Sequence, residues 1–291
     1  MGDIKPPGSD SPRLRHPSGC QNRPVRIATW NVNSLPARLP RLLGWLDATS
    51  PDVLVMQETK VGQDAFPAEE FAAVGYESAH RGQGRWNGVA VLSRVGIEQV
   101  DSDLPEAPGF PDPAGEPEAR FIAATCGGVR VAAVYVPNGR TPLDPHYGYK
   151  LEWLRALSAH LRPAASGPEP FAVMGDFNVA PADDDVWDIA AFAGSTHVTP
   201  AERAALAGLV EIGLQDVVPT INKGPHPYTY WDYRGGNFHK AMGMRIDLVF
   251  GNQPFVQRVQ SAHVDRDARK PGVKGTPPPS DHAPVVVDLA D

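Results

Sequence analysis

The 291-residue sequence has few cysteines and no long apolar segment. Its two cysteines, Cys20 and Cys126, are too few for a disulfide framework. This indicates a reducing compartment, the cytoplasm, with nucleoid association if the source is bacterial. No apolar run approaches about 18 residues, so we expect no membrane-spanning helix. The N-terminus also lacks the apolar core of a secretory signal.

Positive charge is also scarce. Lys and Arg total 27 against 34 Asp and Glu, which gives a net charge of −7. This balance argues against a protein that coats nucleic acid non-specifically. It is compatible with an enzyme that carries a local basic rim, because the distribution of charge matters more than its sum.

Composition divides the chain into a tail and one domain. Residues 1–22 are rich in Pro, Gly and Ser, which predicts a disordered tail. Residues 23–291 are long enough to build one large core, and we expect a single domain there. Within this domain, residues 101–119 are Pro-rich and acidic, which predicts a surface insertion.

Alternating and β-branched segments predict strands, and apolar residues at helical spacing predict helices between them. The predicted strands cover residues 25–30, 53–56, 88–92, 120–125, 129–136, 171–174, 246–250, 256–264 and 284–289. The predicted helices cover residues 39–46, 147–161 and 199–210, with a short one at 183–187. Pro40 is tolerable only in a first helical turn. Thr199-Pro-Ala-Glu202 is a capping box with proline at the first helical position.

The segment Val173-Met-Gly-Asp-Phe-Asn178 reads as a buried strand that stops at the edge of a site. Gly175 lets the backbone turn. Asp176 and Asn178 lie two residues apart, so in an extended chain they point to the same side. A carboxylate beside a carboxamide can hold a metal, a water or a phosphate, although the same residues also occur in ordinary turns.

Further polar groups follow or adjoin other predicted strands. They are Asn31 and Asn33, Glu58, Tyr135 and Asn138, Asp247, and Asp281 with His282. Each has an ordinary explanation, such as a satisfied turn or an exposed carboxylate. Taken together they indicate one site, because α/β sheets gather their ligands at strand ends.

The set resembles the exonuclease III family of apurinic/apyrimidinic (AP) endonucleases, within the endonuclease/exonuclease/phosphatase superfamily. The segments that carry the resemblance are Ala28-Thr-Trp-Asn-Val-Asn33, Leu54-Val-Met-Gln-Glu-Thr-Lys60, Tyr135-Val-Pro-Asn-Gly139, Met174-Gly-Asp-Phe-Asn-Val-Ala-Pro181, Trp231-Asp-Tyr-Arg234, Arg245-Ile-Asp-Leu248 and Ser280-Asp-His-Ala-Pro284. Deoxyribonuclease I, inositol-phosphate phosphatases and sphingomyelinases share only part of this set. The third, fifth and sixth segments are closer to exonuclease III.

The resemblance implies an α/β fold, a four-layer sandwich of two packed, mostly antiparallel sheets flanked by helices, with residues 23–291 as the catalytic domain. Composition alone would also allow a doubly wound parallel sheet. The implied activity is Mg²⁺-dependent hydrolysis of DNA 5′ of abasic sites, with 3′-to-5′ exonuclease activity, in base-excision repair. The alternative is a phosphatase or phosphodiesterase acting on a small-molecule or lipid phosphate.

The resemblance also implies roles for the strand-end residues. Glu58 would be the main carboxylate of an Mg²⁺ site that also accepts Mn²⁺, with Asn31, Asp281, Asp176 and Asn178 as further candidate ligands. Asp176 would orient or deprotonate the attacking water, and Asn178 would donate to the phosphate oxygens.

Three further residues complete the implied chemistry. Asp247 would hold the imidazole of His282, which would contact the phosphate in its charged form. In a second assignment His282 is the base and Asp176 protonates the leaving group. Tyr135 would donate to the phosphate or assist the leaving oxygen.

The implied partner is double-stranded DNA with abasic sites or 3′ ends, bound by a monomer with no membrane association. Candidate phosphate contacts are Lys60, Arg140, Arg234, Lys240 and Arg245, and the basic loop of Arg266, Arg269, Lys270 and Lys274. Tyr230, Met244 and Ile246 resemble the walls of a pocket for an extruded abasic sugar, and Trp231 belongs to the same aromatic run. The competing interpretations are solvated surface charges and sheet packing. Two departures from relatives are Asn33, an aspartate in some of them, and Met244, commonly an aromatic.

Overall fold

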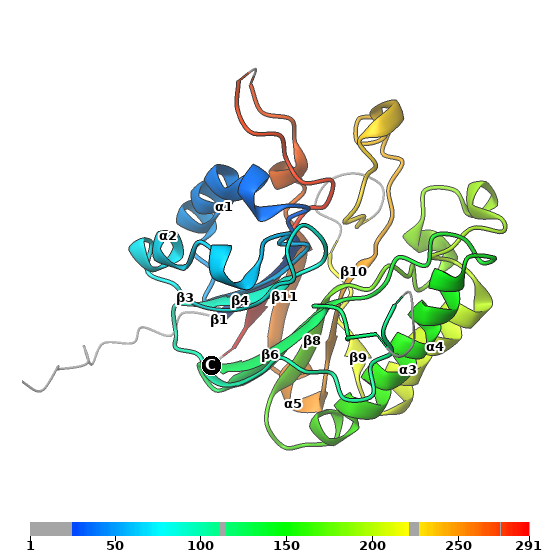
Figure 1. The fold of residues 1–291 in the computed structure, drawn as a ribbon, viewed down its shortest axis with the longest axis horizontal. Helices are drawn as coiled ribbons and strands as arrows, with labels where there is room; N and C mark the ends of the chain where they lie inside the picture. Colours follow the sequence, from blue (N-terminus) through cyan, green and yellow to red (C-terminus); the bar gives the residue numbers. More distant parts are fainter. Residues whose placement is uncertain (1–24, 111–114, 221–226, 274, 291) are drawn as a thin grey trace, which may run out of the picture.

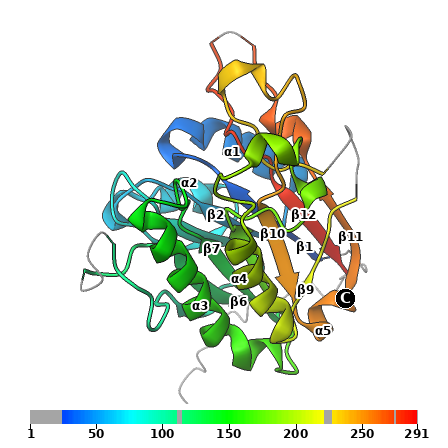
Figure 2. The same cartoon turned by 90° about the vertical axis from the view of Figure 1, so that its right-hand side faces the viewer.

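The computed structural model describes residues 25–110, 115–220, 227–273 and 275–290. The predicted tail at 1–22 and Lys274 lie outside the described residues. In the described part, two six-stranded sheets pack face to face, with helices on both outer faces (Figures 1 and 2). The predicted four-layer sandwich is therefore confirmed.

The first sheet has the strand order β11-β12-β1-β2-β4-β3. Its strands are β11 (Val259–Val264), β12 (Val285–Leu289), β1 (Val25–Asn31), β2 (Val53–Gln57), β4 (Val89–Ser93) and β3 (Glu77–Arg81). Strands β1 and β2 are parallel, and the other neighbours in this sheet are antiparallel.

The second sheet has the order β5-β6-β7-β8-β10-β9. Its strands are β5 (Glu98–Asp101), β6 (Phe121–Cys126), β7 (Val129–Tyr135), β8 (Phe171–Asp176), β10 (Asp247–Gly251) and β9 (Gln215–Asp216). Here β7 and β8 form the parallel pair, and the other pairs are antiparallel. Both sheets are thus mixed and mostly antiparallel, as expected.

Alternation along the strands builds three apolar layers. In β1, Ile27 faces the core between the sheets, whereas Ala28 and Trp30 face the helices. In β8, Met174 enters the central core and Val173 the layer on the other side. Because successive side chains of a strand point to opposite faces, a strand buried on both faces is apolar throughout.

Helices cover the outer faces (Figure 1). Helices α1 (Leu35–Thr49) and α2 (Ala68–Ala73) pack on the first sheet, and α3 (Pro145–Ala165) and α4 (Pro200–Glu211) pack on the second. Short elements complete the described chain: α5 (Gln253–Val256) and the 3₁₀ turns Gln63–Ala65, Asp183–Asp185, Ile189–Phe192, Arg234–Gly236 and Arg266–Arg269. Among the described residues, no helix has the length and apolar character needed to cross a membrane.

Some local predictions were wrong. Pro40 lies inside α1, because the helix begins earlier, at Leu35. Trp187 lies outside the short 3₁₀ turn at Asp183–Asp185. The edge strands β3 and β5 were missed, since they are polar and partly exposed and carry no apolar alternation.

The strand directions bring the predicted site residues to one edge. The parallel strands β1 and β2 end there, as do β7 and β8, while the antiparallel strands β10 and β12 begin there. The register pairs Tyr135 with Asp176 and Asp176 with Asp247. In the other sheet Asn31 pairs with Gln57, the residue before Glu58. Strand direction and register therefore bring residues distant in sequence to one place.

Candidate active site

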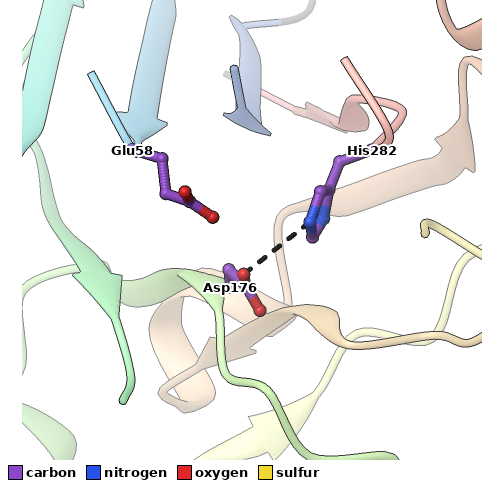
Figure 3. Close-up of side chains that lie close together, drawn as sticks. All are labelled: Glu58, Asp176 and His282. Atoms are coloured by element: carbon purple, nitrogen blue, oxygen red, sulfur yellow. Dashed lines mark ion pairs between the residues drawn. The ribbon is translucent and has the colours of Figure 1, made fainter. Parts of the chain in front are cut away.

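Three titratable side chains converge at this edge. One ligand atom each from Glu58, Asp176 and His282 lie within 4.8 Å of one another, and the side chains point toward a common centre (Figure 3). Asp176 and His282 are buried, and Glu58 is half-buried. Two carboxylates this close repel each other unless cations or donors balance them.

Asn31 bridges the two carboxylates. Its Nδ2 atom donates to Glu58 Oε1 and to Asp176 Oδ2, each at 2.9 Å. Its Oδ1 atom accepts the backbone N–H of Asn33 at 2.9 Å. Asn31 is fully buried, so in this structure it aligns the carboxylates through its amide nitrogen.

Glu58 also pairs with a lysine inside the site. Lys60 Nζ lies 2.7 Å from Glu58 Oε2 and 2.6 Å from Asn33 Oδ1. Burial favours the neutral acid, but Lys60 and the Asn31 amide together lower the pKa of Glu58 below its usual value. Lys60 was expected to contact DNA phosphates, and the structure places it within the carboxylate cluster.

His282 is oriented by Asp247. The Nδ1 atom of His282 donates to Asp247 Oδ2 at 2.7 Å, and its Nε2 atom lies 3.9 Å from Asp176 Oδ2. Burial opposes the charged imidazole, yet Asp247 and Asp176 raise the pKa of His282 to about 10. The ring is therefore an imidazolium at neutral pH, with its Nε2–H directed toward Asp176.

The backbone around His282 is also fixed. The indole nitrogen of Trp30 donates to the carbonyl of His282 at 3.1 Å. Ser280 Oγ donates to the carbonyl of Asn31 at 2.7 Å. These bonds join the segment before β12 to β1, which holds the imidazole beside the ends of the first sheet.

Asp176 is buried and accepts two hydrogen bonds. The backbone N–H of Asn178 donates to Oδ1 at 2.9 Å, and Asn31 holds Oδ2. Burial raises the pKa of Asp176 to about 7, although the charge of His282 works against this rise. A carboxylate with a pKa near neutrality can accept or hold a proton at working pH.

Asn178 adopts the left-handed backbone conformation, with φ 52°. Its Nδ2 atom donates to the carbonyl of Val136 at 3.0 Å, and its Oδ1 atom accepts from Asn138 Nδ2 at 3.2 Å. The amide group has a second N–H, so the expected donation to phosphate stays a prediction.

Tyr135 is held by a group that the sequence did not reveal. The guanidinium of Arg120 lies over its ring, 4.6 Å from the centroid. Arg120 pairs with Glu118, which also accepts from Tyr149 and Asn87. Burial, and then the neighbouring Glu58, raise the pKa of the Tyr135 hydroxyl well above its usual value, so it is a donor at neutral pH.

Glu58, Tyr135, Asp176, Asn178 and His282 line a polar cavity of about 270 Å³. Tyr230, Met244 and Ile246 form its apolar wall, and the Tyr230 ring lies 4.9 Å from that of His282. Asp281 lies in the lining, where its Oδ1 atom accepts from Asn33 Nδ2 at 2.9 Å. The predicted pocket walls and most of the strand-end polar groups thus line one space.

His197 also lines the cavity, and sequence reasoning missed it. Its Nδ1 atom lies 2.5 Å from the backbone carbonyl of Asn178, to which it donates. Burial and the charge of Lys150 lower the pKa of His197 to about 4, so the ring is neutral. The sequence offered no signal, since His197 follows no strand and belongs to no quoted motif.

Two predicted DNA contacts are corrected. Arg245 is 3% exposed, and its guanidinium pairs with Asp185 at 2.6 Å and Asp216 at 2.9 Å, so it is a buried structural cation. Trp231 is 1% exposed and packs against Phe238, which agrees with the sheet-packing interpretation. Neither side chain presents a surface to a duplex.

The other predicted cations differ in exposure. The side chain of Arg234 is 90% exposed and pairs with Asp232, and that of Arg140 is 57% exposed beside Asp144. In the basic loop, Arg269 is buried and donates to the carbonyl of Trp231, whereas Lys270 is exposed. Arg234 and Arg140 therefore remain candidates for phosphate contacts.

Comparison with known proteins agrees with this geometry. The endonuclease/exonuclease/phosphatase family pattern matches residues 28–282. The chain belongs to this family. It is 28% identical to exodeoxyribonuclease III of Haemophilus influenzae over 276 residues, covering 90% of this chain and 98% of the relative. The predicted resemblance to exonuclease III-type AP endonucleases is confirmed.

Solved structures of relatives share the fold. A 3′-5′ exonuclease from Neisseria meningitidis superposes with a TM-score of 0.83 at 36% identity, over 91% of this chain and all of that one. A Neisseria 3′ phosphatase bound to a product DNA hairpin gives the same TM-score and identity, over 92% and 100%. An AP endonuclease from Archaeoglobus fulgidus gives 0.82 at 33%, over 91% and 99%.

Proposed function

We propose that this protein is a Mg²⁺-dependent nuclease that hydrolyses DNA phosphodiesters 5′ of abasic sites and at 3′ ends, as a cytoplasmic monomer in base-excision repair. The observation that carries the proposal is the convergence of Glu58, Asp176 and His282 within 4.8 Å in a polar cavity. The structural relatives, which are a 3′-5′ exonuclease, a 3′ phosphatase bound to a product DNA hairpin and an AP endonuclease, support DNA as the substrate.

The donor set suits a hard divalent cation. Glu58 and Asp176 offer carboxylate oxygens, and the carboxylate of Asp281 and the carboxamide of Asn178 line the same cavity, while Asn31 holds the two carboxylates through its amide nitrogen. Oxygen-rich sites of this kind fit Mg²⁺, with Mn²⁺ as a substitute. When bound, the cation supplies Lewis-acid stabilisation of phosphate charge.

Asp176 is proposed to orient or deprotonate the attacking water. Its carboxylate is buried and fixed through both oxygens, and its pKa of about 7 matches that of a base at neutral pH. Asn178, two residues further along the chain, is proposed to donate its remaining amide N–H to the non-bridging oxygens.

His282 is proposed to bind the scissile phosphate as an imidazolium. Since Nδ1 donates to Asp247, the charged ring offers an Nε2–H to the cavity. A proton donor at this position suits a phosphate oxygen better than it suits removal of a proton from water. This geometry favours Asp176 over His282 as the base.

The substrate is argued from the cavity walls and rim. The apolar side chains of Tyr230, Met244 and Ile246 face polar groups across a cavity of about 270 Å³, which suits a sugar phosphate without a base. Extruding an abasic nucleotide from the duplex costs little free energy, because it has no base to unstack. Exposed Arg234 and Arg140 are proposed to contact flanking phosphates.

A panel of four substrates tests the function. The duplex with one abasic-site analogue, the recessed 3′ end, the 3′-phosphate end and inositol phosphate are each incubated with Mg²⁺ and with chelator. We expect metal-dependent hydrolysis of the DNA substrates and none of inositol phosphate. Hydrolysis of inositol phosphate with every DNA substrate left intact would refute a DNA nuclease and favour the small-molecule phosphatase.

A further inference from the structure

A lysine and a glutamate form a fully buried ion pair behind the site. Lys150 of α3 and Glu202 of α4 are both 0% exposed, and Lys150 Nζ is bonded to Glu202 Oε1. Taking two charges out of water is expensive, and a buried pair is weak evidence for stability. Stability alone therefore does not explain why this pair is buried, and its contacts with the rest of the chain indicate another role.

Lys150 reaches two turns that border the cavity. Its Nζ atom donates to the backbone carbonyl of Asn178 at 2.7 Å and to that of Asn138 at 3.2 Å. These asparagines follow β8 and β7, and their side chains are hydrogen-bonded to each other. One ammonium group thus fixes the backbones of two adjacent cavity-lining turns.

The backbone of these turns needs such support. Asn178 has φ 52°, a left-handed conformation that asparagine adopts more readily than most residues but that its surroundings must still hold in place. The turn at Asn138 is also tightly packed: a Cβ on Gly139 would lie 2.7 Å from Thr196 Oγ1 and 3.0 Å from Lys150 Cδ. Lys150 is therefore in close contact with both turns.

Glu202 is hydrogen-bonded to a third segment that borders the cavity. Its Oε1 atom accepts from the backbone N–H of His197 at 2.9 Å and from Thr196 Oγ1 at 2.6 Å. Its Oε2 atom accepts from the backbone N–H of Thr199, which completes the capping box of α4. The ion pair therefore connects the segments of Asn138, Asn178 and His197.

We propose that the Lys150–Glu202 pair is a positioning device for the nuclease reaction, which holds the carboxamide of Asn178 at the angle needed for phosphate. The proposal rests on the proposed function. Lys150 does not line the cavity, so it acts through Asn178. Its loss is expected to affect the chemical step more than substrate binding.

A double-mutant cycle tests this role. Lys150→Met combined with Glu202→Gln removes the pair without leaving a buried carboxylate unpaired. On the best DNA substrate we expect kcat to fall at least about 10-fold with KM within about 2-fold. In an Asn178→Ala background, adding Lys150→Met and Glu202→Gln should lower kcat by less than about a further 2-fold. Equal losses in both backgrounds would refute positioning through Asn178.

A control ion pair away from the site and a second variant at Lys150 complete the test. Arg26→Met with Asp288→Asn removes an ion pair at the start of β1 and should leave kcat unchanged. Lys150→Arg keeps the charge, but the guanidinium is planar and larger than the ammonium, so its donors cannot meet the same acceptors at the same angles. It should lower kcat with little change in Tm, and a wild-type kcat would overturn the proposal.

Failure of the proposed function is separable from failure of this inference. If the wild-type protein cleaves none of the DNA substrates, the nuclease proposal fails. Crystal structures of the wild type and of the Lys150→Met/Glu202→Gln variant still decide the positioning claim. The variant should show the Asn178 carboxamide rotated or displaced, and an unchanged carboxamide would overturn the inference.

Discussion

The imidazole of His282 and the carboxylate of Asp247 are joined by a 2.7 Å hydrogen bond, although the residues are 35 positions apart in sequence. Asp247 begins β10, and His282 precedes β12 in the other sheet. The bond therefore links the two sheets at the site. The other oxygen of Asp247, Oδ1, is buried and has no hydrogen-bond partner among the described residues. The hydrogen bond that orients the Asp247 carboxylate in the described structure is therefore the one from His282.

This pairing predicts non-additive kinetics. His282→Ala should lower kcat by about 10²–10³-fold, the range for loss of one donor that stabilises developing charge. Asp247→Asn should lower kcat less, because it removes the charge but keeps the ring and an oxygen that can accept from Nδ1. The double variant should be little worse than His282→Ala alone, because the two residues act as one unit. Steady-state rates on an abasic duplex measure this, and fully multiplicative losses would show independent roles.

The carboxylate cluster predicts a specific metal requirement. Chelator should abolish cleavage, and Glu58→Gln should raise the Mg²⁺ concentration needed for half-maximal rate by at least about 10-fold, since one hard ligand charge is lost. Binding should also stabilise the fold, by about 2.7 kcal/mol at 100 times Kd. Thermal melts with and without Mg²⁺ check this, with exposed Glu98→Gln as the control. An equal Tm rise in Glu58→Gln would place the cation elsewhere.

Two arginines should behave in opposite ways. Arg245→Met breaks a buried contact with Asp185 and Asp216 and should destabilise the fold by about 3–5 kcal/mol. Arg234→Ala should leave stability unchanged but weaken DNA binding and reduce the salt slope of log K by roughly 1. Urea unfolding and binding at several salt concentrations separate the two. Unchanged stability in Arg245→Met would contradict its structural assignment.

His146 predicts a loss of stability in acid. Burial, followed by the charges of Arg120 and Arg140, lowers the pKa of His146 to about 4, and its Nδ1 atom accepts the Gly139 N–H at 3.1 Å. The unfolded chain, with a His pKa of about 6.5, binds the proton first. Stability is therefore retained above pH about 6.5 and falls as the pH drops from 6.5 through 4.

The matched variant for this effect is His146→Asn, in which an amide oxygen can replace the Nδ1 acceptor. Its unfolding free energy should depend less steeply on pH between 6.5 and 4. The reduction in slope should correspond to at most one proton in the difference between those bound by the unfolded and the native state. Urea unfolding across this pH range measures the slope. An identical slope in the variant would show that His146 does not contribute.

Much of the site could be predicted because its chemistry is encoded locally. Asp176 and Asn178 follow an apolar strand within one short motif, and the capping box of α4 is confirmed by the bond from the Glu202 N–H to Thr199 Oγ1. Such patterns depend on residues near one another in sequence. The resemblance, more than periodicity, predicted the two packed sheets.

What the sequence could not reveal depends on distant partners. Arg245 reads as a surface cation beside a site motif, but Asp185, 60 residues away, meets it in the interior. Lys150 and Glu202 are separated by 52 residues, and the capping box that identified Glu202 did not reveal its pairing with Lys150. Burial of such charges is decided by tertiary packing, which local patterns do not contain.

The central claim is that this buried cluster hydrolyses DNA phosphodiesters. The most direct measurement is single-turnover cleavage, with enzyme in excess, of a duplex carrying one abasic-site analogue and one recessed 3′ end. Wild-type protein with Mg²⁺ should cut at the 5′ side of the analogue and shorten the 3′ end, while Asp176→Asn binds the duplex but cuts at least about 10²-fold more slowly. Equal single-turnover rates for the wild type and Asp176→Asn would contradict the account.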